Sequence, residues 1–222
     1  MTGREAKDAL YAQFSRLGKA FSNPKRIELL ELLAQVERSV EDLAAASGLD
    51  FANTSAQLQV LSRARLVESR RQGKRVIYRL ADESVVRFLT ALREVSRARL
   101  AEVEQVARDY FDARDELEPV SSGELLERLE ERRALVIDVR PAEEYAAGHV
   151  PGALSIPLAE LKSRLPQLSP DAEIVAYCRG PYCVLAPQAV EILWRAGFRA
   201  RRLEEGFPEW RLAGLPVEAD VA

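Results

Sequence analysis

Apolar residues recur at helical spacing through most of the first hundred residues. This periodicity runs from residue 5 to about residue 34, with a new helix start at Pro24, because proline is tolerated in the first helical turn. A shorter helix is expected over residues 40–47, capped by Ser39 and ended by Gly48. The chain therefore opens as a series of short helices.

The pattern changes after the next helix, which is expected over residues 53–65. Residues 66–70 and 76–80 alternate like two strands, with a turn at 72–74, so they predict a β-hairpin. Helical spacing then returns over residues 84–114 as one long helix with an apolar stripe. A stripe of this kind forms either a core face or a dimer seam.

Short helix, turn, helix and basic hairpin, in that order, predict a winged helix-turn-helix. Residues 20–30, 42–49 and 58–67 resemble the ArsR-type repressor family almost continuously, and residues 71–80 resemble its wing. The resemblance covers about residues 10–110. It implies a homodimer paired through the terminal helices of this domain, and a palindromic double-stranded DNA operator as the partner.

The second helix of the motif, residues 53–65, is the expected recognition helix. Asparagine and glutamine suit adenine edges in the major groove, whereas Leu58 and Leu61 are expected in the core. The polar candidates for reading bases are Asn53, Thr54, Ser55, Gln57 and Gln59.

Positive charge gathers on the predicted hairpin. The net charge of the whole chain is -3, yet residues 1–114 carry 20 Lys/Arg against 16 Asp/Glu, and residues 115–222 carry 12 against 19. The wing cations are expected either to contact phosphates, which makes binding salt-dependent, or only to solubilise the hairpin. They are Arg70, Arg71, Lys74 and Arg75.

Soft-metal sensing by the first half is not expected. Where arsenic sensors of the resembled family carry cysteines, this chain has Ser39 and Glu41, and both of its cysteines follow residue 177. His149 is the only histidine, so Cys and His alone supply no four-ligand zinc site. We expect no metal and no cofactor, and we expect His149 to position a turn by hydrogen bonds.

The sequence pattern of the second half predicts α/β structure. Residues 135–137 and 174–177 are apolar throughout, as parallel strands covered on both faces should be, and residues 184–196 predict a helix. Cys178 therefore opens a loop at the carboxyl end of a strand, where ligands bind in such sheets. Loop amides and the helix dipole should lower the pKa of Cys178 and make it nucleophilic, although a buried inert thiol is the alternative.

Three motifs in this half resemble the rhodanese signature. They are residues 135–153, the cysteine loop with its expected anion-binding positions Gly180, Tyr182 and Val184, and residues 205–217. The resemblance implies a cysteine that carries a persulfide sulfur. Asp138 and Arg140 are expected to hold the strand end and its following loop through hydrogen bonds.

The loop departs from the rhodanese pattern at its end. Cys183 stands where many rhodaneses have an arginine or lysine that binds the anionic sulfur donor, and Pro181 removes one amide. Arg179 is the candidate for the missing charge. We expect Cys178 to attack a sulfur species and Cys183 to resolve it with release of hydrosulfide, and a sulfur-bridged link between the two cysteines is the alternative.

Together these patterns predict two domains, residues 1–114 and 115–222, with a break at 116–123. No signal core or membrane-length apolar run occurs, so a cytoplasmic protein without a membrane partner is expected. The predicted function is a DNA-binding repressor whose fused domain senses small sulfur species or oxidants. The alternatives are a sulfurtransferase or oxyanion reductase independent of DNA binding, and an inert interaction module.

Overall fold

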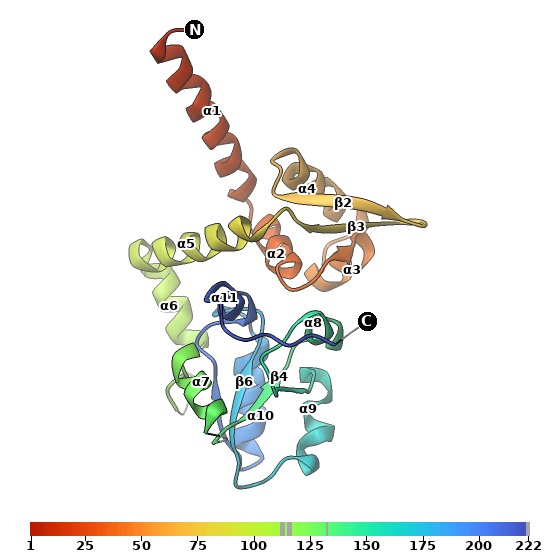
Figure 1. Ribbon diagram of the computed structural model, residues 1–222, viewed down its shortest axis with the longest axis vertical. Helices are drawn as coiled ribbons and strands as arrows, with labels where there is room; N and C mark the ends of the chain where they lie inside the picture. The colour runs from red at the N-terminus through yellow and green to blue at the C-terminus, as the bar shows by residue number, and fades with distance from the viewer. Residues whose placement is uncertain (112–113, 115–116, 132, 221–222) are drawn as a thin grey trace. The chain divides into compact units, whose positions relative to one another are not determined.

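The computed structural model describes residues 1–111, 114, 117–131 and 133–220 (Figure 1). The chain divides into two compact units, Met1–Leu89 and Thr90–Ala222, and each is described by itself.

The expected domain boundary between residues 114 and 115 involves residue 115, and the expected break begins at Glu116. Both residues lie outside the described part, so this boundary stays a prediction.

The first unit holds helices around a small antiparallel sheet of order β1-β3-β2. Its strands are β1 (Arg38–Ser39), β2 (Val67–Gln72) and β3 (Arg75–Leu80). Its helices are α1 (Gly3–Phe21), α2 (Pro24–Leu33), α3 (Val40–Ser47), α4 (Phe51–Arg63) and the start of α5 (Glu83–Arg99).

Local capping fixes the helix starts in this unit. The side chain of Asn23 accepts from the Arg26 N–H, which places Pro24 in the first turn of α2 as expected. Ser39 caps α3 in the same way, and Gly48 ends α3 in the left-handed region with φ of 66°. These three expected boundaries are confirmed.

The expected recognition helix is shifted by two residues. Asp50 accepts a 2.7 Å hydrogen bond from the Asn53 N–H, so α4 begins at Phe51. It ends at Arg63, because Arg65 adopts a positive φ of 60° that a helix cannot contain.

The long helix expected over residues 84–114 is wrong as a single element. Leu100 adopts extended backbone, and the chain forms α5 and then α6 (Ala101–Tyr110). The break carries no proline or glycine. Packing of Phe111, just beyond α6, edge-on against Tyr182 with ring centroids 5.8 Å apart supplies a tertiary contact that periodicity does not reveal.

The core of the first unit is built from leucines on α2, α3 and α4. Leu29, Leu43, Leu58 and Leu61 are fully buried, which confirms the core role expected of Leu58 and Leu61. In contrast, α1 buries only its last residues, Ala20 and Phe21.

The second unit contains a parallel sheet of order β5-β4-β6-β7, with helices on both faces (Figure 1). Its strands are β4 (Leu135–Asp138), β5 (Leu154–Ser155), β6 (Glu173–Tyr177) and β7 (Arg199–Arg202). Its helices besides α6 are α7 (Ser122–Glu130), α8 (Ala142–Ala147), α9 (Leu158–Arg164), α10 (Leu185–Arg195) and α11 (Phe207–Leu212), with a 3₁₀ turn, η2 (Leu165–Gln167).

Alternate residues of β6 enter two different cores. Ile174 and Ala176 pack with residues of α9 and α10, whereas Val175 and Tyr177 pack with residues of α7 and α11. Burial on both faces explains the continuous apolar pattern. Since β6 ends at Tyr177, Cys178 emerges at the carboxyl edge of the sheet.

Candidate functional site

The cysteine loop, residues 178–184, joins β6 to α10. Cys178 is 3% exposed and its Sγ lies 3.6 Å from the carbonyl oxygen of Cys183 and 3.9 Å from that of Gly180. The amides of Gly180 and Ala186 face the Cys178 sulfur. These amides are directed at the thiol, and the binding of an anion by this loop stays a prediction.

The acidity of the two thiols differs from the expectation. Burial raises the pKa of the Cys178 thiol, so the expected lowering at this residue is wrong. A hydrogen bond from Cys178 lowers the pKa of Cys183 to about 7, helped by the amides of Leu185 and Arg179 and by the Arg179 charge. Cys183 is the half-buried member of the pair.

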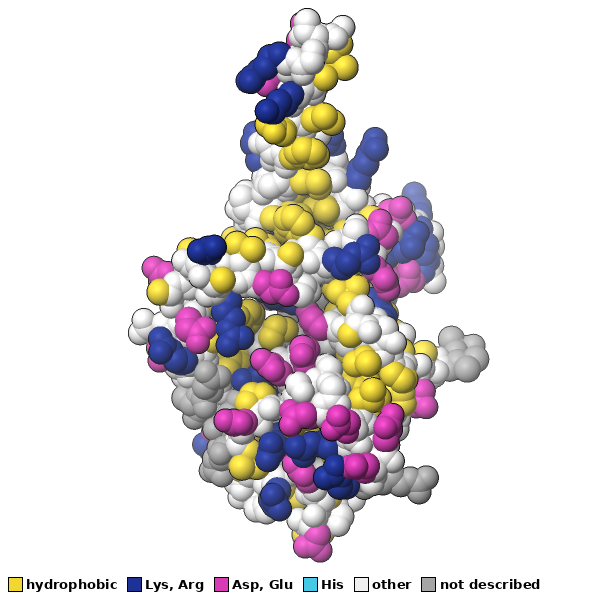
Figure 2. Space-filling model, turned by 60° about the vertical axis from the view of Figure 1, so that its left-hand side comes forward, with side chains coloured by type: hydrophobic (Ala, Val, Ile, Leu, Met, Phe, Trp, Pro, Cys, Tyr) yellow, Lys and Arg dark blue, Asp and Glu magenta, His cyan; other side chains and the backbone are white. Residues whose placement is uncertain are grey.

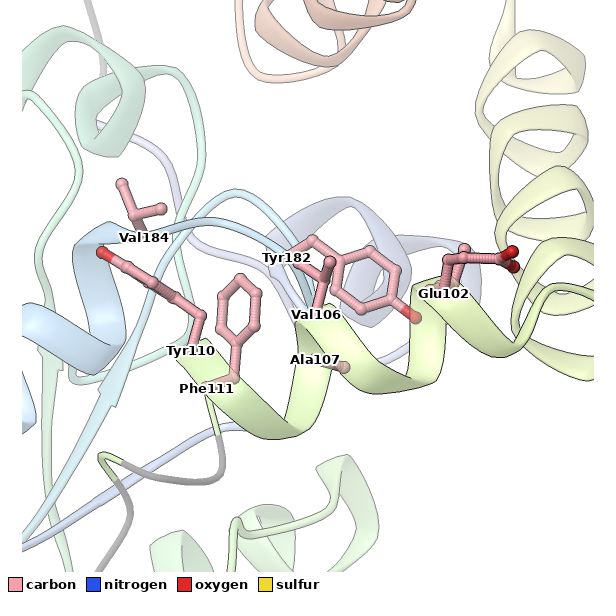
Figure 3. A pocket seen from close by; sticks show the side chains of 8 residues that line it. Glu102, Val106, Ala107, Tyr110, Phe111, Tyr182 and Val184 are labelled. Carbon is pink, nitrogen blue, oxygen red and sulfur yellow. The ribbon is translucent and has the colours of Figure 1, made fainter.

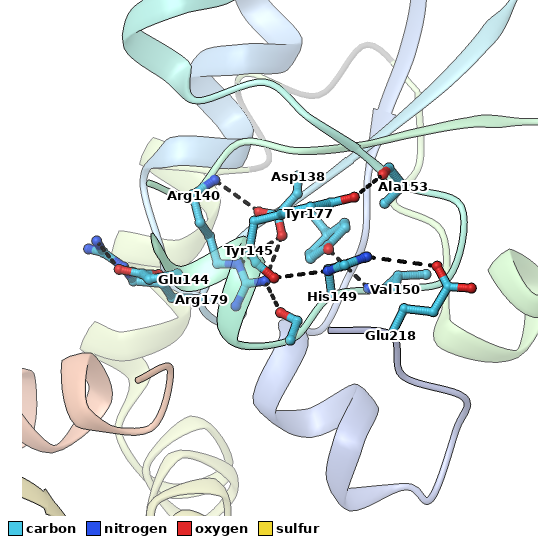
Figure 4. A network of polar contacts seen from close by, with 11 residues as sticks. Asp138, Arg140, Glu144, Tyr145, His149, Val150, Ala153, Tyr177, Arg179 and Glu218 are labelled. Carbon is cyan, nitrogen blue, oxygen red and sulfur yellow. Dashed lines mark hydrogen bonds and ion pairs between the residues drawn. The ribbon is translucent and has the colours of Figure 1, made fainter. Parts of the chain in front are cut away.

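Arg179 belongs to the loop, and its guanidinium is directed at Glu144 (Figure 4). Its Nε lies 2.9 Å from both carboxylate oxygens and its Nη2 lies 2.6 Å from one, while the Glu144 side chain is fully buried. The net charge of the Arg179–Glu144 ion pair is close to zero. Arg179 thus supplies a weaker attraction for an anionic donor than a free cation at the loop would supply.

The strand end before α8 is held by a buried ion pair. Arg140 Nη2 lies 2.6 Å from Asp138 Oδ2 and also donates to the Gly148 carbonyl at 2.7 Å, and neither side chain of the pair is exposed (Figure 4). The expected structural role of Asp138 and Arg140 is confirmed.

His149 has the turn-positioning contacts expected of it. Its Nδ1 lies 2.9 Å from the Tyr145 carbonyl, and since a carbonyl only accepts, Nδ1 carries the proton. The imidazole also stacks on the Tyr145 ring at 3.7 Å and is 4% exposed.

Tyr182 and Val184 do not contribute to an anion cradle through their side chains. They line an apolar groove of about 570 Å³ together with α6 residues such as Val106 and with the neighbouring Phe111 (Figure 3). Periodicity alone did not predict this groove, because it forms between segments far apart in the sequence.

The predicted base-reading residues divide by exposure. Asn53 and Gln59 are exposed, whereas Ser55 and Gln57 are half-buried. Gln57 accepts from Arg26 at 2.9 Å and donates to Asn53 at 3.1 Å.

The prediction that Thr54 reads bases is wrong. It is fully buried and its hydroxyl donates to the Asp50 carbonyl at 2.8 Å, so it does not lie on the exposed face of α4. Sequence reasoning also missed exposed residues of this helix, because it considered only Asn, Gln, Ser and Thr side chains as base readers. They are Phe51, Ala52, Ala56, Val60 and Arg63.

The wing cations are exposed and differ in their contacts. Arg70 pairs with Glu37 and donates to Gln72 at 2.9 Å, and Arg71 donates to the Gly73 carbonyl at 3.2 Å. Lys74 and Arg75 lie at the hairpin turn.

Two further findings concern metal ions and membranes. The described residues contain no group of three or more His, Cys, Asp or Glu side chains placed to hold a metal ion. None of their helices combines the length and hydrophobicity needed to cross a membrane.

Known proteins resemble this chain along nearly all of its length. Residues 23–69 match the bacterial regulatory protein, arsR family, and residues 121–213 match the rhodanese-like domain. The HTH-type transcriptional regulator Rv0324 from Mycobacterium tuberculosis is 48% identical over 214 residues, covering 96% of this chain and 94% of that one.

Two further proteins are each similar to one half of this chain. A sulfurtransferase from Allochromatium vinosum is 31% identical over 45% of this chain and 94% of its own. A solved homodimeric winged helix-turn-helix DNA-binding domain from Mycobacterium bovis is 43% identical and covers 45% of this chain and 91% of that one, with a TM-score of 0.41. This chain therefore belongs to the ArsR family of transcriptional regulators, as a member with a C-terminal rhodanese-like domain.

Proposed function

We propose that this regulator is a repressor whose affinity for double-stranded DNA is set by sulfur chemistry at Cys178 and Cys183. The observation that carries the proposal is the thiol pair itself. The only two cysteines of the chain hydrogen-bond within one loop, and one of them has a pKa of about 7. A thiolate is therefore present at neutral pH beside a second thiol.

The first chemical step is assigned to Cys183, because it is the more acidic and less buried thiol. Its thiolate attacks a sulfane sulfur of a hydropolysulfide, forming a Cys183 persulfide. The sulfur–sulfur bond of the donor breaks, and the shortened polysulfide leaves with the electron pair. This order is the reverse of the one expected from the sequence, in which Cys178 attacks first and Cys183 resolves.

Resolution follows at Cys178. After losing its proton to water, Cys178 attacks the sulfur still attached to Cys183, and hydrosulfide leaves with the electron pair of the broken bond. The products are a Cys178–Cys183 disulfide and hydrosulfide. Two thiols are oxidised and one sulfane sulfur is reduced, so the step needs no other oxidant.

The DNA-binding part of the proposal rests on α4 and the wing. Asn53 and Gln59 present amide groups on the exposed face of α4, and these suit adenine edges. Arg71, Lys74 and Arg75 are exposed cations suited to phosphate contacts.

A homodimer is supported by α1. Hydrophobic side chains follow one side of this helix, with Leu10, Tyr11 and Phe14 more than half exposed and Leu17 40% exposed (Figure 2). A helix that buries so little of its own apolar face is marginal in water, and a second copy of α1 offers a matching face. Two-fold symmetry suits a palindromic operator.

The proposal is tested with cysteine variants in a DNA-binding assay. Wild type, Cys178→Ser and Cys183→Ser are titrated onto the upstream region of the gene, before and after polysulfide treatment. We expect all three reduced proteins to bind, and only wild type to lose affinity through a disulfide. Release of DNA by both serine variants, to the same extent as wild type, would refute the proposal.

A second candidate function is sulfurtransferase activity independent of DNA. The observation in its favour is the similarity of the second half to the Allochromatium vinosum sulfurtransferase. Steady turnover of a sulfur donor with a thiol or cyanide acceptor, unchanged by DNA and accompanied by unchanged DNA affinity, would favour this candidate. Because Arg179 is paired with Glu144, we expect slow turnover with the dianion thiosulfate.

A further inference from the structure

Helix α5 brings an arginine to the sulfur loop. The early residues Val85, Val86 and Leu89 of this helix are buried, and Phe88 packs against Phe21 of α1 with ring centroids 4.5 Å apart. Four residues after Leu89, Arg93 belongs to the second unit and its side chain is only 18% exposed. One continuous helix therefore has buried residues in the first unit and a charged side chain in the second.

Arg93 is held by a carboxylate of α11. Its Nη1 lies 2.5 Å from Glu209 Oε1, and the Glu209 side chain is 12% exposed. The other carboxylate oxygen, Oε2, accepts the Gly206 N–H at 3.2 Å. Glu209 thus contacts both Arg93 and Gly206, the residue that precedes α11.

Gly206 and Phe207, at the start of α11, lie directly against the cysteine loop. The Phe207 N–H donates to the Cys178 carbonyl at 3.0 Å. A Cβ at Gly206 would lie 2.2 Å from the Gly180 nitrogen, so the two backbones are in contact with no room between them. Arg93 also reaches the loop directly, since a Cβ at Gly180 would lie 3.6 Å from its Nη2.

We propose that Arg93 and Glu209 form the link through which the chemical state of the cysteine loop reaches helix α5. This inference rests on the proposed function. A disulfide would hold the two sulfurs about 2 Å apart, closer than hydrogen-bonded thiols lie, and in this proposal the loop that contains Gly180 shifts when the bond forms. Because the backbones of Gly180 and Gly206 are in contact, a shift of the loop also moves Gly206. Gly206 is hydrogen-bonded to Glu209, which in turn holds Arg93, so the displacement reaches both side chains. Arg93 is then displaced in the oxidised protein, and this displacement shifts α5 from a DNA-binding to a free conformation.

The experiment compares Arg93→Met, Glu209→Gln and the double variant with wild type. Arg99→Met is the matched control, because it removes the same charge from an exposed position on the same helix. For each full-length protein we measure the ratio of DNA dissociation constants after and before polysulfide treatment. Intact mass gives the extent of disulfide formation in the same sample, and thermal unfolding confirms the fold.

We expect the ratio to be on the order of 10 or more for wild type and Arg99→Met, within the usual range of allosteric coupling. We expect it to fall below about 3 for Arg93→Met and Glu209→Gln, while the disulfide still forms, with no further loss in the double variant. Glu209→Gln keeps an acceptor for the Gly206 N–H, so it decides the test if Arg93→Met does not fold.

Two results would overturn the link. One is a wild-type ratio in both Arg93→Met and Glu209→Gln; the other is an equal loss in Arg99→Met, which would assign the effect to general charge on α5. A ratio near one in wild type itself, with the disulfide formed, would instead refute the proposed function. The two failures are therefore distinguishable.

Discussion

The thiol pair makes a specific prediction about reactivity and pH. Cys178 donates a hydrogen bond to Cys183 and is the largest cause of its lowered pKa, and Arg179 adds a smaller contribution. Replacing Cys178 with alanine removes that hydrogen bond. The pKa of Cys183 should then rise towards the ordinary thiol value of about 8.5.

The size of the effect follows from the ionised fraction. With a pKa of about 7, Cys183 is about half ionised at pH 7. An ordinary thiol is about 3% ionised at that pH, so Cys178→Ala should slow the attack of Cys183 on an electrophile roughly fifteenfold. The sign is fixed by the chemistry, because the thiolate is the nucleophile and reactivity rises as pH passes through the pKa.

The assay is alkylation by iodoacetamide between pH 5.5 and 9.5, followed by mass mapping of each cysteine. In wild type we expect Cys183 to react first, with a midpoint near pH 7, and Cys178 to lag because burial raises its pKa. In Cys178→Ala the Cys183 midpoint should move up by about one unit or more. Faster alkylation of Cys178 than of Cys183, with a midpoint near 7, would refute the reasoning and restore the order expected from the sequence.

Three further predictions concern the fold, the dimer and the wing. Arg140→Met leaves the carboxylate of Asp138 buried without its ion partner, so urea denaturation should show a loss of about 3–5 kcal/mol; a loss under about 1 kcal/mol would contradict the role of the pair. Phe14→Glu places a charge on the exposed apolar face of α1 and should give a monomer in sedimentation, whereas an unchanged dimer would exclude this face. Lys74→Ala should weaken DNA binding about equally for all sequences and reduce the salt slope by about one, and an unchanged slope would show that Lys74 only solubilises the wing.

Local signals in the sequence were enough for much of the fold. Asn23 and Ser39 cap helices with their own side chains, and Gly48 supplies a left-handed residue, so each acts within a few residues of its position. The apolar runs of β4 and β6 and the length of the connecting loop placed Cys178 at the sheet edge.

Features that depend on distant contacts could not be predicted. The break at Leu100 carries no breaker residue, and β1 is a two-residue strand that exists only because it pairs with β3. Thr54 shows the same limit, because its hydroxyl has a backbone partner one turn earlier and its burial depends on packing.

The candidate site also combines features that local sequence predicts with features that depend on distant contacts. The loop and its two thiols were identified from spacing, but which thiol is more acidic depends on their relative burial and on the direction of one hydrogen bond. Arg93 and Glu209 lie 116 positions apart, and no local pattern joins them.

The most direct test of the account measures DNA affinity for the upstream region in one sample taken through three states. The states are fully reduced, treated with polysulfide, and reduced again with dithiothreitol, with intact mass recorded at each. We predict a loss of affinity on the order of tenfold or more with formation of the Cys178–Cys183 disulfide, and full recovery on reduction. Unchanged affinity in a sample whose mass shows the disulfide would contradict the account.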